Sequence, residues 1–584
     1  MQSALRALRS SKSGPWRVSC SRCHSTATAP ESSSAARLRF APSPTGALHL
    51  GGLRTALFNY LLARKLGGKW LLRVEDTDQS RLVPGSVENL IKSLEWAGLD
   101  YDEGVGRSGG KHGPYTQSER LDLYRHYAKE LVDGGHAYEC FCSPDELLAI
   151  KSSLKKQGHF HGYDGRCRHL SRDDVQQRKR AGHKHVIRFK SQAEKETLPE
   201  DLIFGPAQPT TVSTGADDFI LMKADAWPTY HLASVVDDHL MEISHVLRGE
   251  EWLPSVTKHH QLYRAFGWKP PQFAHLPLLA NLDGTKLSKR TGDVSVDAYR
   301  DKGYEPEALV NFLALMGWDY QTAIENAHAA ADEHGDGLLP FHARGDKHSI
   351  YELFTLPQLV AAFDLGLVTH RRAAVNLGKL DFLNKMHLRR KVGRLGEDGE
   401  LVSTGKVLDP TASEEGRDEL VKRYQASLRE QEVLKDCALV DDLEYVGMVF
   451  DTELARTVKL CDMAPKSLFF YLKPGYDSAE AKQFLAKLRL STYVEAVDTV
   501  AEELDNLIQK GRKLDVDLCW EAMHATTAKL GLRKNSDLTL PMRHALTGCQ
   551  AGPGVPQLMT ALGPAESLER LQAGSRFAAA RGRA

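Results

Sequence analysis

The amino-acid sequence predicts an α/β protein in which a doubly wound parallel sheet is split by an inserted domain and followed by all-helical domains. Three observations predict this class. Short apolar segments alternate with amphipathic ones over residues 37–135, the alternation resumes near residue 217, and the pattern turns helical beyond about residue 321. Strands that alternate with helices indicate a parallel sheet, because each parallel pair needs a crossover that is usually a helix.

The first predicted strand leads into the most informative motif of the chain, residues 39–52. Two prolines stiffen an extended segment, which turns at Gly46 into a helix that opens near His49. A helix start presents unpaired backbone N–H groups and the positive end of its dipole, and Gly51 and Gly52 let an anion come close to the backbone. The segment therefore predicts a phosphate-binding site.

The next elements continue the alternation. Residues 70–74 are strand-like, and residues 84–98 place apolar side chains on one face of a helix. Ser118 can cap a further helix, which two glycines end at residues 134–135. Residues 136 to about 215 are more polar and rich in His, Cys and Lys, so we interpret them as an insertion between two halves of one sheet.

A second motif lies far downstream. The turn Asn281–Thr285 is followed by Lys286–Arg290, which holds three cations in five residues. Such a loop suits the negative charge that builds on a polyphosphate during displacement at the α-phosphate. On its own it would more often be a solvated loop. Together with the helix start at His49, it predicts a site that activates a substrate with ATP.

Length and composition set limits on the class of protein. With 584 residues the chain is long enough for about three to five domains. It is 42% apolar and 26% charged, and no apolar run approaches the ~20 residues of a membrane span, so we expect no membrane partner. The formal net charge of zero neither predicts nor excludes a nucleic-acid partner, which would have to meet local basic patches.

Residues 1–36 differ in kind from the rest. They carry several Arg and Lys, many Ser and Ala, and no acidic residue before Glu31. This composition is typical of an organellar transit peptide, and we expect a mitochondrial one that directs the protein to the mitochondrial matrix. A disordered tail is the alternative. The nine cysteines of the chain are spread in a way that predicts reduced thiols rather than a disulfide framework.

Five ordered blocks of residues resemble the glutamyl-tRNA synthetases of bacterial and organellar type, which are class I aminoacyl-tRNA synthetases. Pro42–Gly52 lies where class I enzymes carry a His-Ile-Gly-His motif, and Lys286–Arg290 lies where they carry Lys-Met-Ser-Lys-Ser. The blocks between them are Arg73–Asp78, Gly113–Arg120, and Pro228–His239 with Leu247–Trp252. The resemblance is dense over residues 37–317 and looser beyond them.

The resemblance implies a Rossmann-like class I catalytic domain and a division of the chain. The expected parts are a transit peptide (1–36), the first half of the catalytic domain (37–135), an inserted acceptor-binding domain (136–216), the second half with the lysine loop (217–320), a stem-contact region (321–378) and a helical anticodon-binding region (379–584).

Three features of the later part are less regular. The weakly apolar stretches 322–347 and 391–417 are expected to be exposed or flexible insertions. The basic run Arg389–Lys391 could contact phosphate, although such a run is more often a solvated face.

The implied activity is that of a glutamate–tRNA ligase. ATP and L-glutamate give glutamyl-adenylate and pyrophosphate, with Mg²⁺ sharing the phosphate charge, and glutamate then passes to the 3′-terminal adenosine of tRNA(Glu). Many organellar versions also charge tRNA(Gln), and the sequence leaves that second tRNA open. We expect a monomer.

The resemblance also implies the site residues. Catalytic roles are expected for His49, Lys286 and Lys289. The glutamate-binding set is Arg39, Phe40, Ala41, Ser43, Glu75, Tyr230, His231, Leu232, Ala233, Ser234 and Arg248. The ATP-binding set is His49, Gly51, Gly52, Glu251, Lys286, Leu287, Ser288, Lys289 and Arg290.

The chemistry of these residues agrees with glutamate. Arg39 and Arg248 can pair with the two carboxylates of the substrate, and Glu75 supplies a counter-charge for its ammonium group. Glutamine would leave a guanidinium in such a pocket unpaired, which is a physical basis for rejecting it. Asp237 and Asp238 could suggest a metal site, but in the family they lie in a helix behind the glutamate pocket, so we expect a structural role.

A candidate zinc set lies in the insertion. Cys140, Cys142, Cys167 and His169 provide three thiolates and one imidazole, which complete a tetrahedral structural site. Some bacterial members of the family bind zinc with this spacing. The alternative is a remnant of a lost site. A helix start at Ser143, with Glu146 three residues on, is expected to return the chain to the second pair.

Four other interpretations were weighed. Residues 104–109 match the dinucleotide fingerprint of nicotinamide oxidoreductases, but no buried strand precedes them and no helix is expected to follow them. A glutaminyl-tRNA synthetase shares the fold, although the first motif favours glutamate. A shortened relative that glutamylates a tRNA base lacks the C-terminal domains present here. A catalytically dead RNA-binding protein is disfavoured by the intact His49, Lys286, Lys289 and Arg39.

Overall fold

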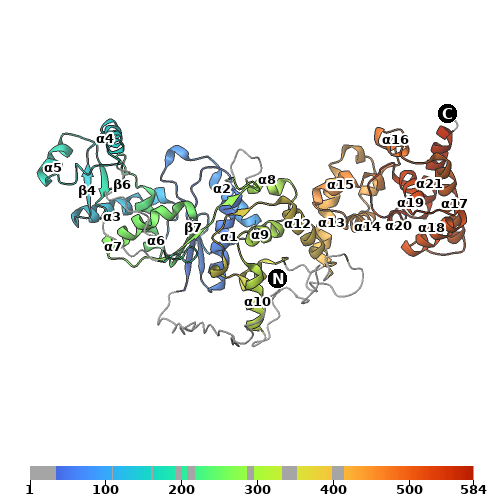
Figure 1. The fold of residues 1–584 in the computed structure, drawn as a ribbon, viewed down its shortest axis with the longest axis horizontal. Helices are drawn as coiled ribbons and strands as arrows, with labels where there is room; N and C mark the ends of the chain where they lie inside the picture. Colours follow the sequence, from blue (N-terminus) through green and yellow to red (C-terminus); the bar gives the residue numbers. More distant parts are fainter. Residues whose placement is uncertain are drawn as a thin grey trace, which may run out of the picture. The chain divides into compact units, whose positions relative to one another are not determined.

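A twisted parallel sheet forms the centre of the first half of the chain (Figure 1). The computed structural model describes residues 35–582 except 108–109, 159–161, 193–199, 207–217, 286–294, 332–351, 397–400 and 402–413. The sheet has five strands in the order β3-β2-β1-β7-β8, and all its pairings are parallel. The strands are β1 (Arg37–Phe40), β2 (Lys69–Leu72), β3 (Glu103–Gly104), β7 (His245–Gly249) and β8 (Gln272–Leu276). The predicted fold class is confirmed.

Helices carry the crossovers of this sheet, as parallel pairing requires. All four residues of β1 are buried, and α1 (Leu50–Lys65) and α2 (Ser86–Trp96) return the chain to β2 and β3. From β1 the chain builds outward on one side through β2, and on the other side it meets β7. Ligands of such sheets bind outside the carboxyl ends of the strands at the point where this order reverses, which here lies between β1 and β7.

A second, antiparallel sheet interrupts the parallel one. Its three strands, in the order β4-β5-β6, are β4 (Ala137–Cys140), β5 (Val186–Phe189) and β6 (Ile220–Met222). The helices of this part are α4 (Pro144–Lys156) and α5 (Arg172–Arg180), and α4 begins with the predicted capping box of Ser143 and Glu146. A small core of its own holds Tyr138, Ile150 and Leu154 together with Cys140 and Cys167.

The prediction for Ser118 was wrong. Ser118 lies inside the short 3-10 turn Gln117–Arg120, and its backbone N–H donates to Asp76. Helix α3 (Leu121–Asp133) follows this turn directly, and no side chain caps its start. The buried carboxylate of Asp76 therefore fixes the turn that Ser118 was expected to begin. Two more helices, α6 (Tyr230–Leu240) and α7 (Val256–Phe266), pack against one another after the second sheet.

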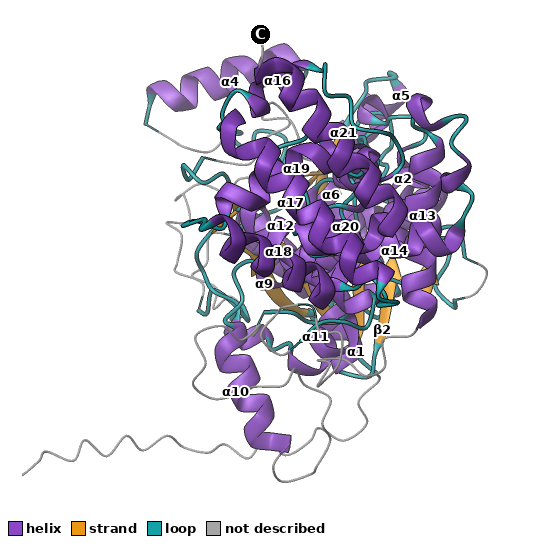
Figure 2. Cartoon of the chain, turned by 90° about the vertical axis from the view of Figure 1, so that its right-hand side faces the viewer, coloured by secondary structure: helices purple, strands orange, loops and turns teal. Residues whose placement is uncertain are grey.

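Beyond the parallel sheet, regular structure in the described residues is almost entirely helical (Figure 2). One small parallel pair remains, β9 (Leu279–Ala280) with β10 (Ala373–Ala374). The helices up to residue 391 are α8 (Val296–Asp301), α9 (Pro306–Leu315), α10 (Tyr320–Ala331), α11 (Leu356–Ala362) and α12 (Leu377–Lys391). The later helices are α13 (Glu414–Arg429), α14 (Leu443–Leu454), α15 (Met463–Lys466), α16 (Ala479–Leu485), α17 (Leu490–Gln509), α18 (Val516–Leu530), α19 (Ser536–Thr547), α20 (Val555–Leu562) and α21 (Pro564–Gly582).

The two stretches that were expected to be exposed or flexible insertions, 322–347 and 391–417, contain packed residues. Residues 322–331 belong to α10, where Ala323 and Ile324 are buried, while residues 332–347 lie outside the described residues. In the second stretch Leu395 is fully buried and residues 414–417 open α13. A weakly apolar composition hid these packed positions, because a few buried side chains on one face of a helix are enough to hold it.

The basic run Arg389–Lys391 is neither a solvated face nor available to phosphate. Arg389 and Arg390 are buried, and Nη2 of Arg389 donates to the carbonyl oxygen of Ala455 at 2.9 Å. Nζ of Lys391 lies 2.8 Å from a carboxylate oxygen of Glu305, the residue before α9. These cations connect α12 to its neighbours, so both sequence interpretations of the run were wrong.

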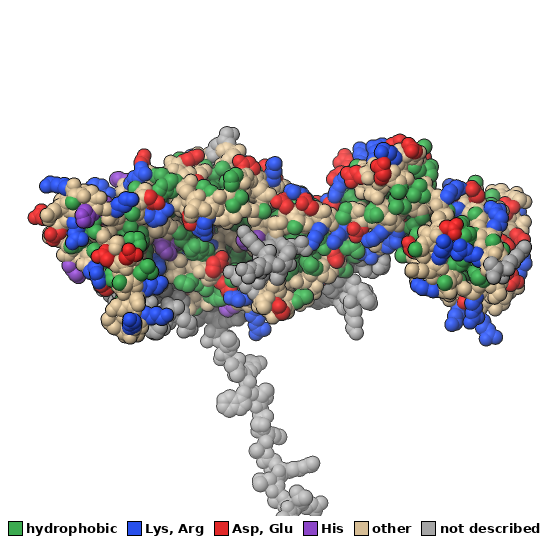
Figure 3. Space-filling view, turned by 90° about the horizontal axis from the view of Figure 1, so that it is seen from above, with side chains coloured by type: hydrophobic (Ala, Val, Ile, Leu, Met, Phe, Trp, Pro, Cys, Tyr) green, Lys and Arg blue, Asp and Glu red, His purple; other side chains and the backbone are tan. Residues whose placement is uncertain are grey.

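Membrane spans, cysteines and surface charge are features of the whole set of described residues. None of the described helices is both long and apolar enough to cross a bilayer. The seven cysteines among the described residues form no disulfide with one another. On the face shown in Figure 3, acidic and basic side chains are interspersed, in keeping with a net charge of zero. The expected transit peptide, residues 1–36, lies outside the described residues except at its end.

Candidate active site

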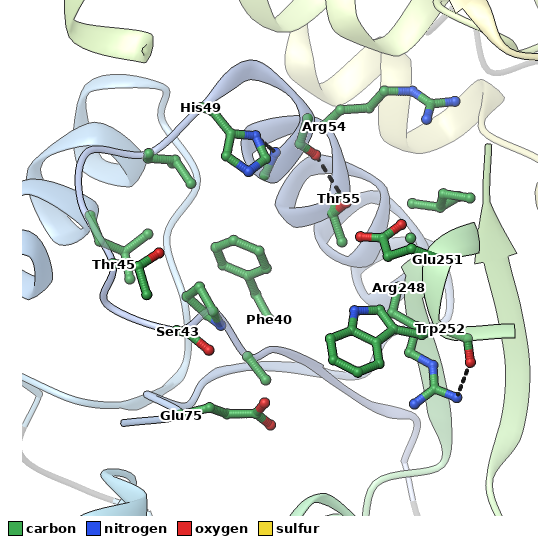
Figure 4. A pocket seen from close by; sticks show the side chains of 18 of the residues that line it. Phe40, Ser43, Thr45, His49, Arg54, Thr55, Glu75, Arg248, Glu251 and Trp252 are labelled. Carbon is green, nitrogen blue, oxygen red and sulfur yellow. Dashed lines mark hydrogen bonds between the residues drawn. The ribbon is translucent and has the colours of Figure 1, made fainter. Parts of the chain in front are cut away.

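A cavity of about 400 Å³ opens at the carboxyl edge of the parallel sheet, at the reversal point between β1 and β7. In Figure 4 His49 lies at the top of the cavity, whereas Glu75 and Arg248 lie at the bottom. Most of the predicted residues line it: Arg39, Phe40, Ala41, Ser43, His49, Gly51, Gly52, Glu75, Tyr230, Arg248 and Glu251.

The helix start at His49 forms the upper end. His49 is the N-cap of α1, and its Nδ1 accepts the backbone N–H of Gly52 at 2.9 Å. A Cβ on Gly51 would come within 3.2 Å of the same ring nitrogen, so side chains there would crowd the cap. The first turn of α1 holds no acidic residue. The remaining N–H groups and the helix dipole are thus open to an anion.

Lys286, Leu287, Ser288, Lys289 and Arg290 of the predicted ATP set lie outside the described residues. The chain that follows them is described. Ser295 forms a backbone bridge with His49, and the N–H of Val296 donates to the carbonyl oxygen of Leu48 at 2.8 Å. One flank of the lysine segment is therefore fixed beside the helix start.

A network of buried charges forms the floor of the lower end. Arg73 donates to Glu75 at 3.0 Å and to Asp238 at 2.7 Å, and Asp238 also accepts from Arg39 at 3.0 and 3.3 Å. Burial raises the pKa of Glu75, against the opposing pull of Arg73 and Arg39. Burial also opposes ionisation of Asp238, but the same two guanidinium groups hold its pKa below the ordinary value.

Asp237 and Asp238 have structural roles in this network. Both are buried on α6, and Asp237 accepts from Arg120 at 2.7 Å and from Gln117 at 2.8 Å. Their partners are cationic, amide or hydroxyl groups of neighbouring segments, which is how buried carboxylates are normally compensated. Among the described residues neither carboxylate belongs to a cluster that could hold a metal ion.

Arg248 is the cation of the site without a counter-charge. It is 5% exposed, and among the described residues it forms no ion pair. Its Nη1 donates to the hydroxyl of Tyr230 at 3.0 Å, and its Nη2 contacts the carbonyl oxygen of Trp252 at 3.4 Å. A buried guanidinium without a carboxylate is costly. The site is therefore arranged to receive an anionic group from a ligand.

Four predicted glutamate-binding residues do not line the cavity: His231, Leu232, Ala233 and Ser234. Helix α6 begins at Tyr230, and only this first residue reaches the cavity. Leu232, Ala233 and Ser234 are completely buried, and His231 hydrogen-bonds His259 at 3.2 Å. A motif taken as a continuous run of residues does not show that only Tyr230 lines the cavity and that the four residues after it lie behind it.

The sequence reasoning missed several residues of the site. Trp252 packs against Tyr230 with ring centroids 4.0 Å apart and ring planes inclined by 34°. Arg54 donates to the carbonyl oxygens of Met316 and Pro277. Trp252 ended a block that the resemblance had already singled out, so its aromatic ring was a usable signal. Arg54 gave none, because one Arg in an amphipathic helix predicts solvent exposure.

The cysteine set is assembled only in part. The thiol sulfurs of Cys140, Cys142 and Cys167 lie within 4.8 Å of one another, with 3.6 Å between those of Cys142 and Cys167. His169 is exposed and does not belong to the cluster. The hydroxyl of Tyr163 lies at the cluster instead, 3.3 Å from Sγ of Cys140.

The motif at residues 104–109 forms no dinucleotide site among the described residues. Gly104 ends the two-residue strand β3, and a turn rather than a helix follows it through residue 107. Arg107 closes this turn by donating to Asp100 at 2.8 Å. The oxidoreductase interpretation therefore fails on the structural context that the fingerprint requires.

Comparisons with known proteins agree with this geometry. The family model described as the catalytic domain of class I tRNA synthetases (E and Q) matches residues 35–333, and an anticodon-binding domain model matches residues 419–575. The chain is similar to the glutamate–tRNA ligase of Clostridioides difficile, with 37% identity over 92% of this chain and 98% of the relative. It is 38% identical to that of Chloroherpeton thalassium over 92% and 97% of the two chains.

Solved structures give the same result. The crystal structure of a glutamate tRNA ligase from Elizabethkingia meningosepticum, in complex with its amino acid, has a TM-score of 0.73 and 30% identity over 93% of this chain and 99% of that chain. The glutamate–tRNA synthetase of Elizabethkingia anophelis has a TM-score of 0.70 at 30% identity, over 93% and 100% of the two chains.

Proposed function

This chain belongs to the class I tRNA synthetases for glutamate and glutamine, and on that premise we propose that it is a glutamate–tRNA ligase. The observation that carries the choice of substrate is Arg248, a buried guanidinium that lines the cavity without an ion-pair partner among the described residues. A substrate carboxylate would supply the missing negative charge. The family models and the similar relatives confirm the family resemblance seen in the sequence.

The amino acid binds at the lower end of the cavity. Arg248 and Arg39 receive its carboxylates, and Glu75 receives its ammonium group. Nη1 of Arg39 is open for this role, because among the described residues it contacts only the carbonyl oxygen of Leu247, at 3.5 Å. Bringing an ammonium group beside Glu75 favours the ionised carboxylate, which burial alone disfavours.

ATP binds at the upper end, with its phosphates at the helix start of His49, Gly51 and Gly52. The α-carboxylate of glutamate attacks the α-phosphorus, the bond to the bridging oxygen breaks, and pyrophosphate leaves with that electron pair. Bound together with ATP, Mg²⁺ would share the charge of the phosphates. Catalysis then rests on positioning and electrostatics, so no side chain has to act as nucleophile.

Lys286 and Lys289 are proposed to hold the leaving phosphates. The support is the position of their downstream flank, where Ser295 bridges the backbone of His49. Lys289→Ala should slow adenylate formation far more than it raises the KM for glutamate, because the charge it meets develops only in the transition state. An equal effect on both would contradict this role. In the second step a hydroxyl of the terminal adenosine attacks the acyl carbon and releases AMP.

Aminoacylation with glutamate and ATP tests the function. Separate organellar tRNA(Glu) and tRNA(Gln) transcripts serve as acceptors, and folding of the enzyme is verified by circular dichroism. We expect glutamyl-tRNA(Glu). We also propose that tRNA(Gln) is charged with glutamate, as it is by many organellar members of the family. Folded enzyme that forms no glutamyl-tRNA from either acceptor would refute the ligase assignment. Failure to charge tRNA(Gln) alone would refute only the second proposal and would leave the ligase assignment intact.

Residues 1–36 are proposed to direct the protein to the mitochondrial matrix, on the strength of their basic, Ser- and Ala-rich composition. A fusion of these residues to a fluorescent protein should enter mitochondria, and a variant with the five Arg and Lys changed to Gln should not. Equal distribution of the two fusions would refute the proposal.

The cysteine cluster is proposed to hold a structural zinc ion through Cys140, Cys142 and Cys167. Three thiol sulfurs within 4.8 Å of one another match the donors that zinc prefers, and the hydroxyl of Tyr163 lies 3.3 Å from Sγ of Cys140. Bound there, zinc would tie α4 and β4 to the turn at residue 167. Elemental analysis of purified protein should find zinc in the wild type and in His169→Ala, but not in Cys142→Ser. A zinc-free wild type would refute this site.

A further inference from the structure

Two buried residues that the sequence did not single out lie behind the amino-acid end of the cavity: Asp201 and His275. His275 belongs to β8 and pairs directly with Arg248 of β7 in the parallel register. Asp201 lies in the chain between β5 and β6, and it docks on β8 through a backbone bridge with Phe273. The side chain of His275 is 0% exposed and that of Asp201 is 7% exposed.

The three side chains form a continuous line of hydrogen bonds. Nε of Arg248 donates to Nε2 of His275 at 3.0 Å, and Nδ1 of His275 lies 2.6 Å from Oδ2 of Asp201. The second carboxylate oxygen, Oδ1, accepts the backbone N–H groups of Ile203 and Phe204 at 3.0 and 2.9 Å. Asp201 is therefore immobilised by its own loop, and it can fix the ring beside it.

These partners select one tautomer of His275. Nε2 faces an N–H of a guanidinium, which keeps its proton, so Nε2 must carry the lone pair and Nδ1 the proton. The Nδ1 proton meets a carboxylate oxygen, which only accepts. Burial lowers the pKa of His275, and the charge of Arg248 acts in the same direction against the opposing pull of Asp201. The neutral ring is the form that this arrangement holds.

We propose that Asp201 and His275 are positioning residues, which hold the guanidinium of Arg248 in the orientation that receives a carboxylate of the amino acid. The inference rests on the proposed function. We call residues 137–222, which carry the antiparallel sheet, the interrupting segment. Asp201 lies in this segment between two strands of that sheet, so the glutamate pocket would depend on a residue from outside the parallel sheet.

A neutral ring suits this role better than a carboxylate in direct contact. A carboxylate at the position of His275 would neutralise Arg248 and compete with the substrate for it. The imidazole accepts one hydrogen bond without supplying a charge, so Arg248 keeps its full attraction for an incoming anion. Asp201 places its negative charge one ring further away, where it orients more than it neutralises.

Asp201→Asn tests the tautomer. The amide has nearly the shape of the carboxylate, but one of its two ends must present N–H donors. Either these face the backbone N–H groups of Ile203 and Phe204, or they face His275 and drive its proton to Nε2, against Arg248. We expect the KM for glutamate in tRNA charging to rise about 10- to 100-fold, as for a lost hydrogen bond to a charged group, with the KM for ATP within about twofold.

His275 offers a conservative rescue. His275→Gln returns an oxygen acceptor to Nε of Arg248 and should stay within about fivefold of the wild type in glutamate KM, whereas His275→Leu should match Asp201→Asn. Asp218→Asn is the matched control: Asp218 is also buried in the interrupting segment and accepts from Tyr138 at 2.7 Å, but it has no link to Arg248. Its glutamate KM should be unchanged.

Three results would show that Asp201 and His275 do not position Arg248. A glutamate KM within twofold of the wild type in Asp201→Asn, equal values in His275→Gln and His275→Leu, or the same rise in Asp218→Asn would each overturn the positioning role. Melting temperatures are measured for every variant, and if Asp201→Asn is unfolded at the assay temperature, the pair at His275 decides alone. A wild type that fails to charge tRNA with glutamate would instead refute the proposed function itself.

Discussion

The two ends of the cavity bind their ligands by different means. The lower end uses charged side chains, Arg39, Glu75 and Arg248, which are buried and held by other side chains. The upper end uses the backbone N–H groups of a helix start, arranged by His49 as its N-cap. One end therefore depends on which side chains are present, and the other depends mainly on where the backbone runs.

The two ends therefore have different tasks: the lower end selects the amino acid, and the upper end positions the nucleotide. A backbone N–H donates a hydrogen bond to any phosphate oxygen, so the upper end holds a nucleotide in place without choosing among anions of similar shape. Buried guanidinium and carboxylate groups lose much when they are left unpaired, so the lower end rejects a substrate that lacks one charge. Changes at the lower end should therefore affect amino-acid KM, and changes at the upper end should affect kcat.

The largest expected effect comes from Arg248→Ala. Removing the guanidinium should lower kcat/KM for glutamate about 10³-fold, because a desolvated carboxylate loses its charge-assisted partner. Most of the loss should appear in the KM for glutamate and little in the KM for ATP. Steady-state charging of tRNA measures both. A loss confined to kcat, with both KM values unchanged, would place Arg248 outside the amino-acid end.

Asp238→Asn should be the next largest effect, and it acts on stability. The change leaves Arg39 and Arg73 with one buried carboxylate fewer, and breaking such a network costs about 3–5 kcal/mol of unfolding free energy. Urea unfolding measures it. Asp122→Asn, which breaks the exposed pair with Arg125, is the control and should cost under about 1 kcal/mol. Equal destabilisation by the two variants would show that the buried network does not support the lower end.

His49 tests the upper end. His49→Ala should reduce kcat about 10²-fold through lost contact with the phosphates, and should also cost about 1 kcal/mol of stability through the lost N-cap. His49→Asn restores an acceptor for the N–H of Gly52, so it should recover stability but not kcat. Recovery of both by Asn would mean that His49 acts only as a cap.

The smallest effect is a pH dependence at Glu75. Burial raises its pKa, so this carboxylate protonates at a higher pH than an ordinary Glu, although Arg73 and Arg39 oppose the shift. As the pH falls, the neutral form loses its attraction for the ammonium group, and the glutamate KM should rise by at most about tenfold per pH unit. The ATP KM should stay flat. A glutamate KM that decreases as the pH is lowered would contradict the assignment of Glu75.

The sequence predicted the parallel sheet and its interruption because apolar periodicity and turn chemistry are local signals. Most of the lining residues were predicted from the resemblance to a known family. The residues behind the cavity gave no such signal. Asp201 and His275 are 74 residues apart in the sequence, and they meet only because a loop returns to strand β8. Burial of a cationic run, as at Arg389, was hidden for the same reason: its partner Ala455 lies 66 residues away.

The zinc set shows the same limit. Spacing along the chain predicted four ligands, and the structure brings three of them together. The hydroxyl of Tyr163, rather than the ring of His169, lies beside the three sulfurs. The spacing of residues along the chain limits which side chains can come together. The conformation of the turn between them determines which side chains do so.

The most direct test of the account is the choice between glutamate and glutamine at the lower end. With tRNA(Glu), ATP and wild-type enzyme, kcat/KM for glutamate should exceed that for glutamine by about 10⁴-fold, because the amide cannot pair with a buried guanidinium. A ratio near one, or a preference for glutamine, would contradict the claim that buried charges at this end select the substrate.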